Sequence, residues 1–203
     1  MRIILLVLLS LFAACNEQDI RNEAPETVID SMAALIRPGD IILRAGRDEV
    51  SQLFKRLNTH NQTYSHCGMA VTDSNGVSVI HIVGSVNNPS GKMIKESLRS
   101  FVQSRSNSSW AIVRYDLDSI SKQNFISSTM SFMDNSIVFD HDFDLATDDK
   151  MYCTEMIYKA FVLASKDSLL ILPTLTQTGK KYIAVDNLFG HKHCKTIGEI
   201  TYK

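Results

Sequence analysis

Residues 148–157 read Asp-Asp-Lys-Met-Tyr-Cys-Thr-Glu-Met-Ile and place a cysteine, Cys153, at the start of a helical pattern. The apolar residues that follow recur at helical spacing: Met156, Ile157, Ala160, Phe161 and Ala164. They predict a helix over residues 150–164, capped by Asp148 or Asp149, with Cys153 in its fourth position. A thiol attacks as its thiolate, which a helix N-terminus favours, and free N–H groups there can stabilise an oxyanion. Cys153 is therefore a candidate nucleophile, and the alternative is a buried core cysteine on an amphipathic helix.

A catalytic thiol needs a base, and two upstream strands each carry a histidine. Apolar runs on both sides of the Asp-Ser-Asn-Gly turn at residues 73–76 predict a β-hairpin. Strand alternation places His66 on one face and Cys67 on the other, and His81 interrupts the second strand. A single strand histidine is usually a satisfied core residue. Two on neighbouring strands, together with Cys153, favour a catalytic set instead.

The remaining pattern alternates short strands and helices. Strands are predicted over residues 40–44, 66–72, 77–84, 92–96, 110–115 and 197–202. Further helices are predicted over residues 28–36, 48–57, 97–102 and 119–133, and Asp48 is the expected cap of the second of these. Residues 138–149 are acidic and irregular, which indicates a loop that leads to the cysteine helix.

The chain as a whole has the composition of one globular domain. It has 203 residues, a net charge of -1 and 44% hydrophobic residues, which is enough for a substantial core. Acidic and basic residues are interspersed, so no basic patch predicts a nucleic-acid partner.

The first residues indicate export. Arg2 precedes an apolar run over residues 3–12, which is too short to span a membrane, and Ala13-Ala14 follow. Small residues directly before Cys15 resemble the bacterial lipobox, which implies cleavage there, lipid on the Cys15 thiol and anchoring in a membrane of the cell envelope. The alternative is ordinary signal cleavage, which leaves a soluble periplasmic protein. The predicted organisation is a signal peptide, a lipidated tether and one domain, over residues 1–14, 15–26 and 27–203.

The other cysteines are few and odd in number. Once Cys15 is lipidated, Cys67, Cys153 and Cys194 remain, so at least one thiol is unpaired even in an oxidising compartment. We expect Cys153 to be free and Cys67 to be a small buried hydrophobe rather than a redox partner. The stretch His191-Lys192-His193-Cys194 contains side chains that bind zinc or copper. No second ligand cluster accompanies it, so a solvated tail is the preferred interpretation and neither a metal nor another cofactor is predicted.

Three short motifs, taken in order, resemble the circularly permuted NlpC-type papain-like hydrolases of the YiiX/YaeF-like branch. They read Arg-Pro-Gly-Asp-Ile-Ile from residue 37, Tyr-Ser-His-Cys-Gly-Met from residue 64 and Tyr-Cys-Thr-Glu from residue 152. The resemblance covers residues 38–161. It implies an α+β, permuted papain-like fold, with an antiparallel sheet or small barrel and the nucleophile helix packed against it.

The same resemblance implies roles for the candidate site residues. Cys153 would be the nucleophile and His66 the base. His81 stands where the branch commonly has a Glu or another polar residue that orients the imidazole, and a neutral ring stabilises an imidazolium less than a carboxylate does. Tyr64 and Tyr152 flank the site and could line it or donate to the oxyanion, or could only pack near its rim.

Glu155 follows the candidate nucleophile by two residues. We interpret it as a first-turn residue favoured by the helix dipole, or as a link to a neighbouring loop, and not as the third member of the catalytic set.

Three functions are compatible with these observations. The first is a cysteine hydrolase, an amidase or peptidase, that acts on amide bonds of peptidoglycan-derived peptides or acyl-amino acids. The second is a lipid thioesterase or acyltransferase on the same scaffold. The third is a non-catalytic envelope lipoprotein, against which the set Cys153, His66 and His81 argues. A polar groove would favour peptide substrates, and a long apolar tunnel would favour acyl chains.

Overall fold

The computed structural model describes residues 26–84, 91–168 and 170–203. Its helices are α1 (Glu26–Ala33), α2 (Glu49–Arg56), α3 (Leu98–Phe101), α4 (Ser119–Asp134), α5 (Cys153–Ser165) and the 3-10 helix η2 (Val185–Leu188). Its longer strands are β1 (Ile41–Gly46), β2 (His66–Asp73), β3 (Gly76–Ile82), β4 (Met93–Ser97), β5 (Asn107–Tyr115) and β10 (Cys194–Thr201). Two-residue strands are β6 (Val138–Phe139), β7 (Lys150–Met151), β8 (Thr174–Leu175) and β9 (Lys181–Tyr182).

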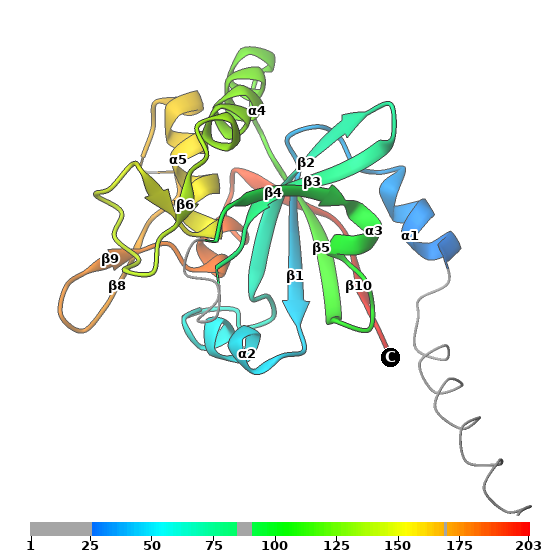
Figure 1. Ribbon diagram of the computed structural model, residues 1–203, viewed down its shortest axis with the longest axis horizontal. Helices are drawn as coiled ribbons and strands as arrows, with labels where there is room; N and C mark the ends of the chain where they lie inside the picture. Colours follow the sequence, from blue (N-terminus) through cyan, green and yellow to red (C-terminus); the bar gives the residue numbers. More distant parts are fainter. Residues whose placement is uncertain (1–25, 85–90, 169) are drawn as a thin grey trace, which may run out of the picture.

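The longer strands form one six-stranded sheet in the order β10-β5-β1-β2-β3-β4. Every neighbouring pair in it is antiparallel. Helices α4 and α5 lie together on one side of the sheet, and α1 and α3 lie on the other (Figure 1). This arrangement confirms the predicted α+β fold with an antiparallel sheet and the cysteine helix packed against it.

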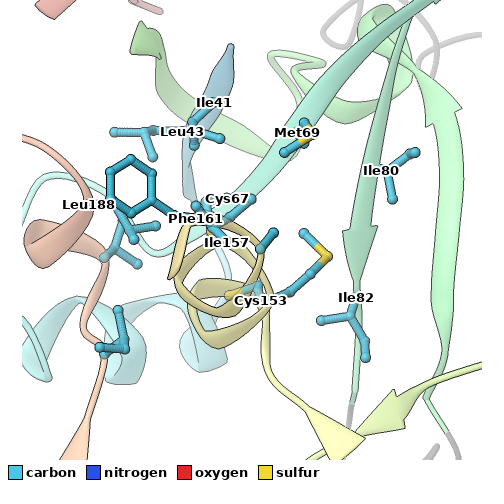
Figure 2. Packing of buried hydrophobic residues seen from close by; sticks show 14 of the residues in the cluster. Ile41, Leu43, Cys67, Met69, Ile80, Ile82, Cys153, Ile157, Phe161 and Leu188 are labelled. Carbon is cyan, nitrogen blue, oxygen red and sulfur yellow. The ribbon is translucent and has the colours of Figure 1, made fainter. Parts of the chain in front are cut away.

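Each face of the sheet buries its own core because strand side chains alternate between faces. Leu43, Cys67 and Met69 point toward α5, where Ile157 and Phe161 pack against them (Figure 2). The opposite face carries another set of buried side chains, which packs against α1 and α3: Ile42, Ala70, Val79, Trp110 and Ile112. The predicted separation of His66 from Cys67 on opposite strand faces follows the same alternation.

The Pro-Gly-Asp motif has a structural explanation. Asp40 is 1% exposed and accepts hydrogen bonds from Arg114 Nε and Nη2, each at 2.7 Å. It also accepts from the backbone N–H of Arg37 at 2.7 Å. A buried carboxylate with this many charge-assisted bonds ties the start of β1 to β5, where Arg114 lies.

Two predictions about helices are corrected. The cysteine helix begins at Cys153 rather than residue 150, because Lys150–Met151 forms strand β7, which pairs with β6. Its N-cap is Tyr152, not Asp148 or Asp149, so Cys153 is its first residue rather than its fourth.

Helix α2 has the predicted cap but not a buried apolar face. Asp48 accepts from the backbone N–H of Ser51, as expected. Val50, Leu53 and Leu57 are 47%, 59% and 41% exposed, and no residue of α2 is fully buried. Helical periodicity located the helix correctly, but the structure leaves much of its apolar side uncovered.

The predicted signal peptide and Cys15 lie outside the described residues, as does most of the predicted tether. Within residues 26–84, 91–168 and 170–203, none of the helices combines the length and the apolar character needed to cross a bilayer.

Candidate functional site

The candidate nucleophile sits at the very start of α5. Cys153 is 5% exposed and follows Tyr152, which has an extended backbone with φ of -102° and ψ of 171°. The Tyr152 backbone N–H donates to Glu155 Oε2 at 3.2 Å, which stabilises this sharp change from strand to helix. The first-turn N–H groups of a helix have no partner within the helix, so they can act as oxyanion donors beside the sulfur.

His66 and His81 meet across β2 and β3. His66 Nε2 lies 2.9 Å from His81 Nδ1, and the rings are nearly perpendicular. His81 is 1% exposed, and burial lowers its pKa to about 4, so its ring is neutral near neutral pH. A neutral imidazole has one donor and one acceptor nitrogen, so the direction of this hydrogen bond depends on what His81 contacts on its other side.

That contact is Glu96, which sequence reasoning missed. His81 Nε2 lies 2.8 Å from Glu96 Oε1, and the Ser100 hydroxyl donates to Glu96 Oε2. The hydrogen bond with His81 lowers the pKa of Glu96 to about 2, so the carboxylate is ionised. Strand β4 pairs Val79 with Glu96, which puts Glu96 on the face that carries His81. An acidic residue on the next predicted strand was the available signal, but only strand register shows that it points at His81.

The Glu96 carboxylate sets the direction of the hydrogen-bond chain. It accepts from His81 Nε2–H, which makes His81 Nδ1 an acceptor for His66 Nε2–H. His66 Nδ1 is then the unprotonated ring nitrogen. A histidine in this tautomer can accept a proton from a thiol on its Nδ1 side.

Cys67 and His66 both act on the Cys153 thiol and lower its pKa. The hydrogen bond from the Cys67 thiol is the largest influence and lowers the pKa of Cys153 well below its ordinary value of 9.0. Burial opposes this effect, while the charge and hydrogen bond of His66 and the backbone N–H of Cys67 reinforce it. Burial and the bond to Cys153 raise the pKa of Cys67. Cys153 is therefore the thiol that ionises, and Cys67, expected as a small hydrophobe, is both buried and in contact with it.

Arg44 and Phe101 complete the surroundings of the histidines. Arg44 lies opposite His66 across β1 and β2, donates to the Phe101 carbonyl at 2.9 Å and lies 4.4 Å from the centre of its ring. The same ring packs against His81 and His66, with centroids 4.9 and 5.7 Å away. Burial, the His66 ring and the charge of Arg44 all lower the pKa of His81. Arg44 therefore helps to keep His81 neutral.

Gly68 allows the two histidine strands to approach. A Cβ at this position would lie 2.5 Å from Val79 Cγ1, 2.8 Å from the Ile80 carbonyl oxygen and 3.0 Å from His81 Cβ. Side chains that are this close to backbone atoms force the strands apart. The glycine in the Tyr-Ser-His-Cys-Gly motif is thus required by the close approach of β3, from Val79 to His81.

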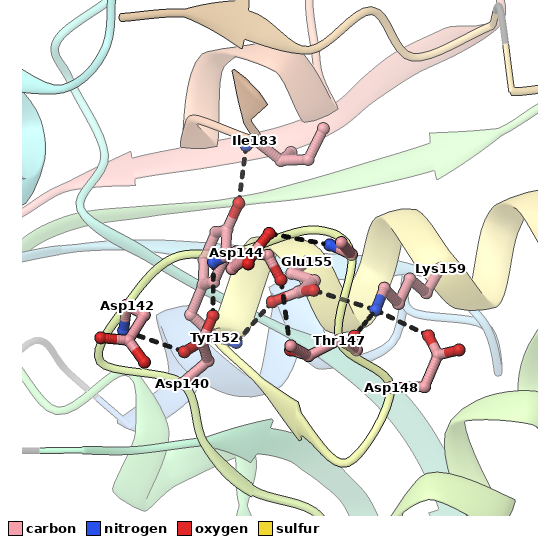
Figure 3. Close-up of polar contacts among 10 residues, drawn as sticks. Asp140, Asp142, Asp144, Thr147, Asp148, Tyr152, Glu155, Lys159 and Ile183 are labelled. Atoms are coloured by element: carbon pink, nitrogen blue, oxygen red, sulfur yellow. Dashed lines mark hydrogen bonds and ion pairs between the residues drawn. The ribbon is translucent and has the colours of Figure 1, made fainter. Parts of the chain in front are cut away.

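A small pocket of about 20 Å³ opens at Cys153, which is room for roughly one water molecule. The Thr154 hydroxyl donates to the Ile183 carbonyl at 2.6 Å. The Ile183 N–H donates to the Tyr152 hydroxyl at 2.7 Å (Figure 3). These bonds hold one wall against the start of α5. The pocket is neither a polar groove nor a long tunnel, and its other walls are mostly apolar and aromatic: Phe54, Leu57, Phe143, Tyr182, Ala184 and Val185.

The two candidate tyrosines have different positions. Tyr152 lines this pocket, whereas Tyr64 is not among the residues that line it. The Tyr64 hydroxyl donates to Glu199 Oε1 at 2.6 Å, and its ring packs edge-on against Phe189. This geometry favours a packing role for Tyr64.

Glu155 links α5 to the preceding loop. It is fully buried, and Lys159 Nζ lies 3.1 Å from its Oε1 while also bonding the Thr147 carbonyl and Asp148 (Figure 3). Burial raises the pKa of Glu155 to about 7, although Lys159 opposes this. No hydrogen bond or ion pair among the described residues joins Glu155 to either His66 or His81. Its contacts agree with both expected roles: Glu155 lies in the first turn of α5, and through Lys159 it is linked to the preceding loop.

The His191–Cys194 segment lies apart from this cluster. The ring centroids of His191 and His193 are 6.3 Å apart, and both rings line a second, wider pocket of about 480 Å³. In the part of the chain that the structure describes, no three His, Cys, Asp or Glu side chains are placed to share a metal ion.

Comparisons with known proteins agree with this arrangement. A family model described as permuted papain-like amidase enzyme, YaeF/YiiX, matches residues 35–189. Among solved structures, the metalloprotein YiiX from Escherichia coli is similar, with a TM-score of 0.64 and 18% identity over 81% of this chain and 98% of that one. A search of curated proteins found no match. Because the described residues place no three such ligands together, they do not fit a metal centre.

Proposed function

Since the chain belongs to the YaeF/YiiX family of permuted papain-like amidases and is a cysteine hydrolase, we propose that it cleaves amide bonds with Cys153 as nucleophile and His66 as base. His81 orients His66, and Glu96 stands behind His81. The observation that carries this proposal is the hydrogen-bonded order His66, His81, Glu96, with distances of 2.9 Å between the rings and 2.8 Å to the carboxylate, next to Cys153, whose pKa His66 helps to lower.

The proton path follows from the tautomers. His66 Nδ1 takes the thiol proton, and the Cys153 thiolate attacks the substrate carbonyl carbon. The oxyanion forms beside the first N–H groups of α5, and His66 then gives its proton to the leaving amine. Water, deprotonated by His66, hydrolyses the thioester and releases the free thiol and the carboxylic acid. While His66 is charged, its Nε2–H donates to His81, so the negative charge of Glu96 acts through one intervening ring.

Thiol labelling tests the assignment of the nucleophile. Iodoacetamide or an electrophilic amide probe should label Cys153 faster than Cys67 or Cys194 near neutral pH, and His66→Ala should slow labelling of Cys153. Cys194→Ser is the matched control, because Cys194 is half-buried on β10 and its hydrogen bond goes to the His191 carbonyl. Equal labelling of the three thiols would contradict the proposal.

The proposed substrates are peptidoglycan-derived peptides or acyl-amino acid amides, and the proposed location is the bacterial envelope. The secretory pattern and the Ala13-Ala14-Cys15 stretch support this location. Purified protein, incubated with peptidoglycan fragments and with acyl-amino acids, should release amines that Cys153→Ser does not release. In cells, a lipid precursor should label the wild-type chain but not Cys15→Ser. Labelling that persists in Cys15→Ser, or protein that stays soluble, would leave ordinary signal cleavage as the explanation.

A lipid thioesterase or acyltransferase is the second candidate, and the apolar walls of the Cys153 pocket favour it. Phe54, Leu57 and Val185 offer contacts to an acyl chain and few hydrogen bonds to a peptide. Acyl thioesters and acyl-amino acid amides that share the same chains separate the two reactions. Faster turnover of the thioesters, increasing with chain length, would replace the amidase proposal. No turnover of either series, with Cys153 unlabelled, would indicate a non-catalytic lipoprotein.

A further inference from the structure

Two thiols meet at the candidate site, although the proposed hydrolysis uses only one of them. Cys67 lies on β2 and Cys153 begins α5, and they are 0% and 5% exposed. Both belong to the same core cluster, on the side of the sheet that faces α5 (Figure 2). Both are free, as is Cys194, which lies on β10 at the far edge of the sheet.

Strand geometry explains why Cys67 faces the nucleophile. Residues of β2 alternate, so His66 and Gly68 occupy one face and the Cys67 side chain points to α5. The ladder between β2 and β3 begins at Met69 and Ile80, beyond Cys67. At this end of β2 the thiol and the backbone N–H of Cys67 are close enough to the Cys153 sulfur that both lower the pKa of Cys153.

The two thiols differ in acidity, which favours stepwise oxidation. A peroxide reacts with a thiolate, and the neighbours of Cys153 lower its pKa well below the ordinary value of 9.0, so Cys153 forms a thiolate more readily than Cys67 does. Cys67, buried and bonded to that sulfur, stays protonated and unreactive until a sulfenic acid forms next to it. A sulfenic acid with a neighbouring thiol condenses with that thiol to form a disulfide. A sulfenic acid without a neighbouring thiol is oxidised further to sulfinic acid, and this second oxidation is irreversible in most proteins.

We propose that Cys153 is a site of reversible peroxide modification and that Cys67 is its resolving thiol. In the first step the Cys153 thiolate attacks one oxygen of hydrogen peroxide, the O–O bond breaks, and the released hydroxide takes up a proton to become water. The Cys67 sulfur then attacks the sulfenic sulfur, and the departing hydroxide takes the Cys67 proton as a second water. The two thiols lose two electrons in total and the peroxide gains them. The resulting Cys67–Cys153 disulfide blocks the nucleophile until a dithiol reductant restores it.

This inference rests on the proposed nucleophile for its effect on turnover, but the cross-link can be measured without substrate. Wild-type protein and the variants Cys67→Val and Cys194→Ser are treated with hydrogen peroxide, and mass spectrometry of the intact chain and its peptides follows. Valine fills the Cys67 site without a thiol, so each variant is first checked by thermal unfolding. Wild type and Cys194→Ser should lose the mass of two hydrogens and give a peptide that joins Cys67 to Cys153. Cys67→Val should gain two or three oxygens at Cys153.

Recovery after reduction is the second readout. Dithiothreitol should restore iodoacetamide labelling of Cys153 in wild type and in Cys194→Ser, and this labelling should remain lost in Cys67→Val. Equal recovery in all three proteins, or a disulfide that includes Cys194, would overturn the inference. If Cys67→Val does not fold, Cys67→Ala provides the same comparison. A Cys67–Cys153 cross-link in a protein that hydrolyses no amide would reject the proposed function and leave this inference standing. Amide hydrolysis in a protein that forms no such cross-link would reject this inference and leave the proposed function standing.

Discussion

His66 Nε2 lies 2.9 Å from His81 Nδ1, and the opposite nitrogen of His81 lies 2.8 Å from Glu96. The three side chains come from consecutive strands of the sheet, β2, β3 and β4, and share one of its faces. The residue next to the proposed base, His66, is thus a neutral ring that is itself fixed by a carboxylate. A histidine in this third position can orient the proposed base because the negative charge is present, one ring further from His66.

Replacement of Glu96 by glutamine should weaken catalysis without unfolding the protein. The glutamine amide can either accept from His81 Nε2 or donate to it, so the tautomer of His66 is no longer imposed. We expect kcat/KM to fall by roughly tenfold or more, mainly through kcat. The matched control is Lys95→Gln, on the adjacent exposed position of β4, which should leave kcat unchanged. An unchanged kcat and pH profile in Glu96→Gln would show that Glu96 has no role in setting the tautomers of His81 and His66.

Alkylation of Cys153 should begin at a lower pH than alkylation of Cys194. The hydrogen bond from Cys67, with the contributions of His66, lowers the pKa of the Cys153 thiol well below 9.0, so its thiolate forms at a lower pH than that of an ordinary cysteine. Cys194 should react appreciably only in alkaline solution, because burial raises its pKa. His66→Ala should move the Cys153 profile toward higher pH. Parallel profiles for Cys153 and Cys194 would contradict the assignment, and peptide mapping after iodoacetamide at several pH values measures both.

Gly68→Ala should destabilise the protein and disturb the histidine pair. The added Cβ would lie 2.5 Å from Val79 Cγ1 and 2.8 Å from the Ile80 backbone oxygen, so β2 and β3 must separate. Overpacking of this kind costs about 1–3 kcal/mol of unfolding free energy. Gly198→Ala is a control in another strand of the sheet, since its closest contacts would be with the flexible end of Met32 at 2.8 Å, and Leu35 Cδ1 would lie at an ordinary 3.7 Å. Urea unfolding compares the two, and an equal or larger loss in Gly198→Ala would refute this account of Gly68.

Glu155→Gln should change how stability depends on pH. Burial raises the pKa of Glu155 from 4.5 to about 7 in the folded state, so the folded chain retains a proton that the unfolded chain has released. The contribution of Glu155 to the free energy of unfolding is therefore fully present below pH 4.5 and is lost as pH rises through about 7. Relative to wild type, Glu155→Gln should gain stability over that interval. Thermal unfolding across the interval measures this difference, and a constant difference would show that Glu155 does not titrate there.

Asp148→Asn is the control for that experiment. Asp148 contacts the same Lys159 but its side chain is 89% exposed, so its loss should change unfolding free energy by less than about 1 kcal/mol. A similar pH dependence in Asp148→Asn would trace the effect to Lys159 rather than to buried Glu155.

Much of the secondary structure was predictable because its signals are local. The Asn-Gly turn predicted the β2–β3 hairpin, and Asp48 predicted the start of α2 through its own hydrogen bond to Ser51. The start of α5 was not predictable from periodicity. Residues 150–151 continue the helical pattern, but pairing with β6 draws them into a strand and moves the helix start to Cys153.

The residues around the candidate nucleophile were only partly predictable, because some of their contacts depend on strand pairing and not on a local pattern. Cys153, His66 and His81 stood out because each interrupts or begins a regular pattern. Glu96 and Arg44 did not, since a charged residue in a short strand is ordinarily solvated. Their contacts with the histidines exist only because β4 and β1 lie beside β3 and β2.

The sequence by itself determined the order of the longer elements and a cysteine near a helix start preceded by two strand histidines, because periodicity, turn residues and caps act over a few neighbouring residues. The fold class followed from the resemblance of three short motifs to a known family. Only the tertiary structure decided what each of these side chains touches. Strand order brought Glu96 behind His81, and the face that β2 turns toward α5 put the Cys67 thiol on Cys153. Such contacts join residues that are distant in the chain, and their energy depends on register and burial that no local pattern encodes.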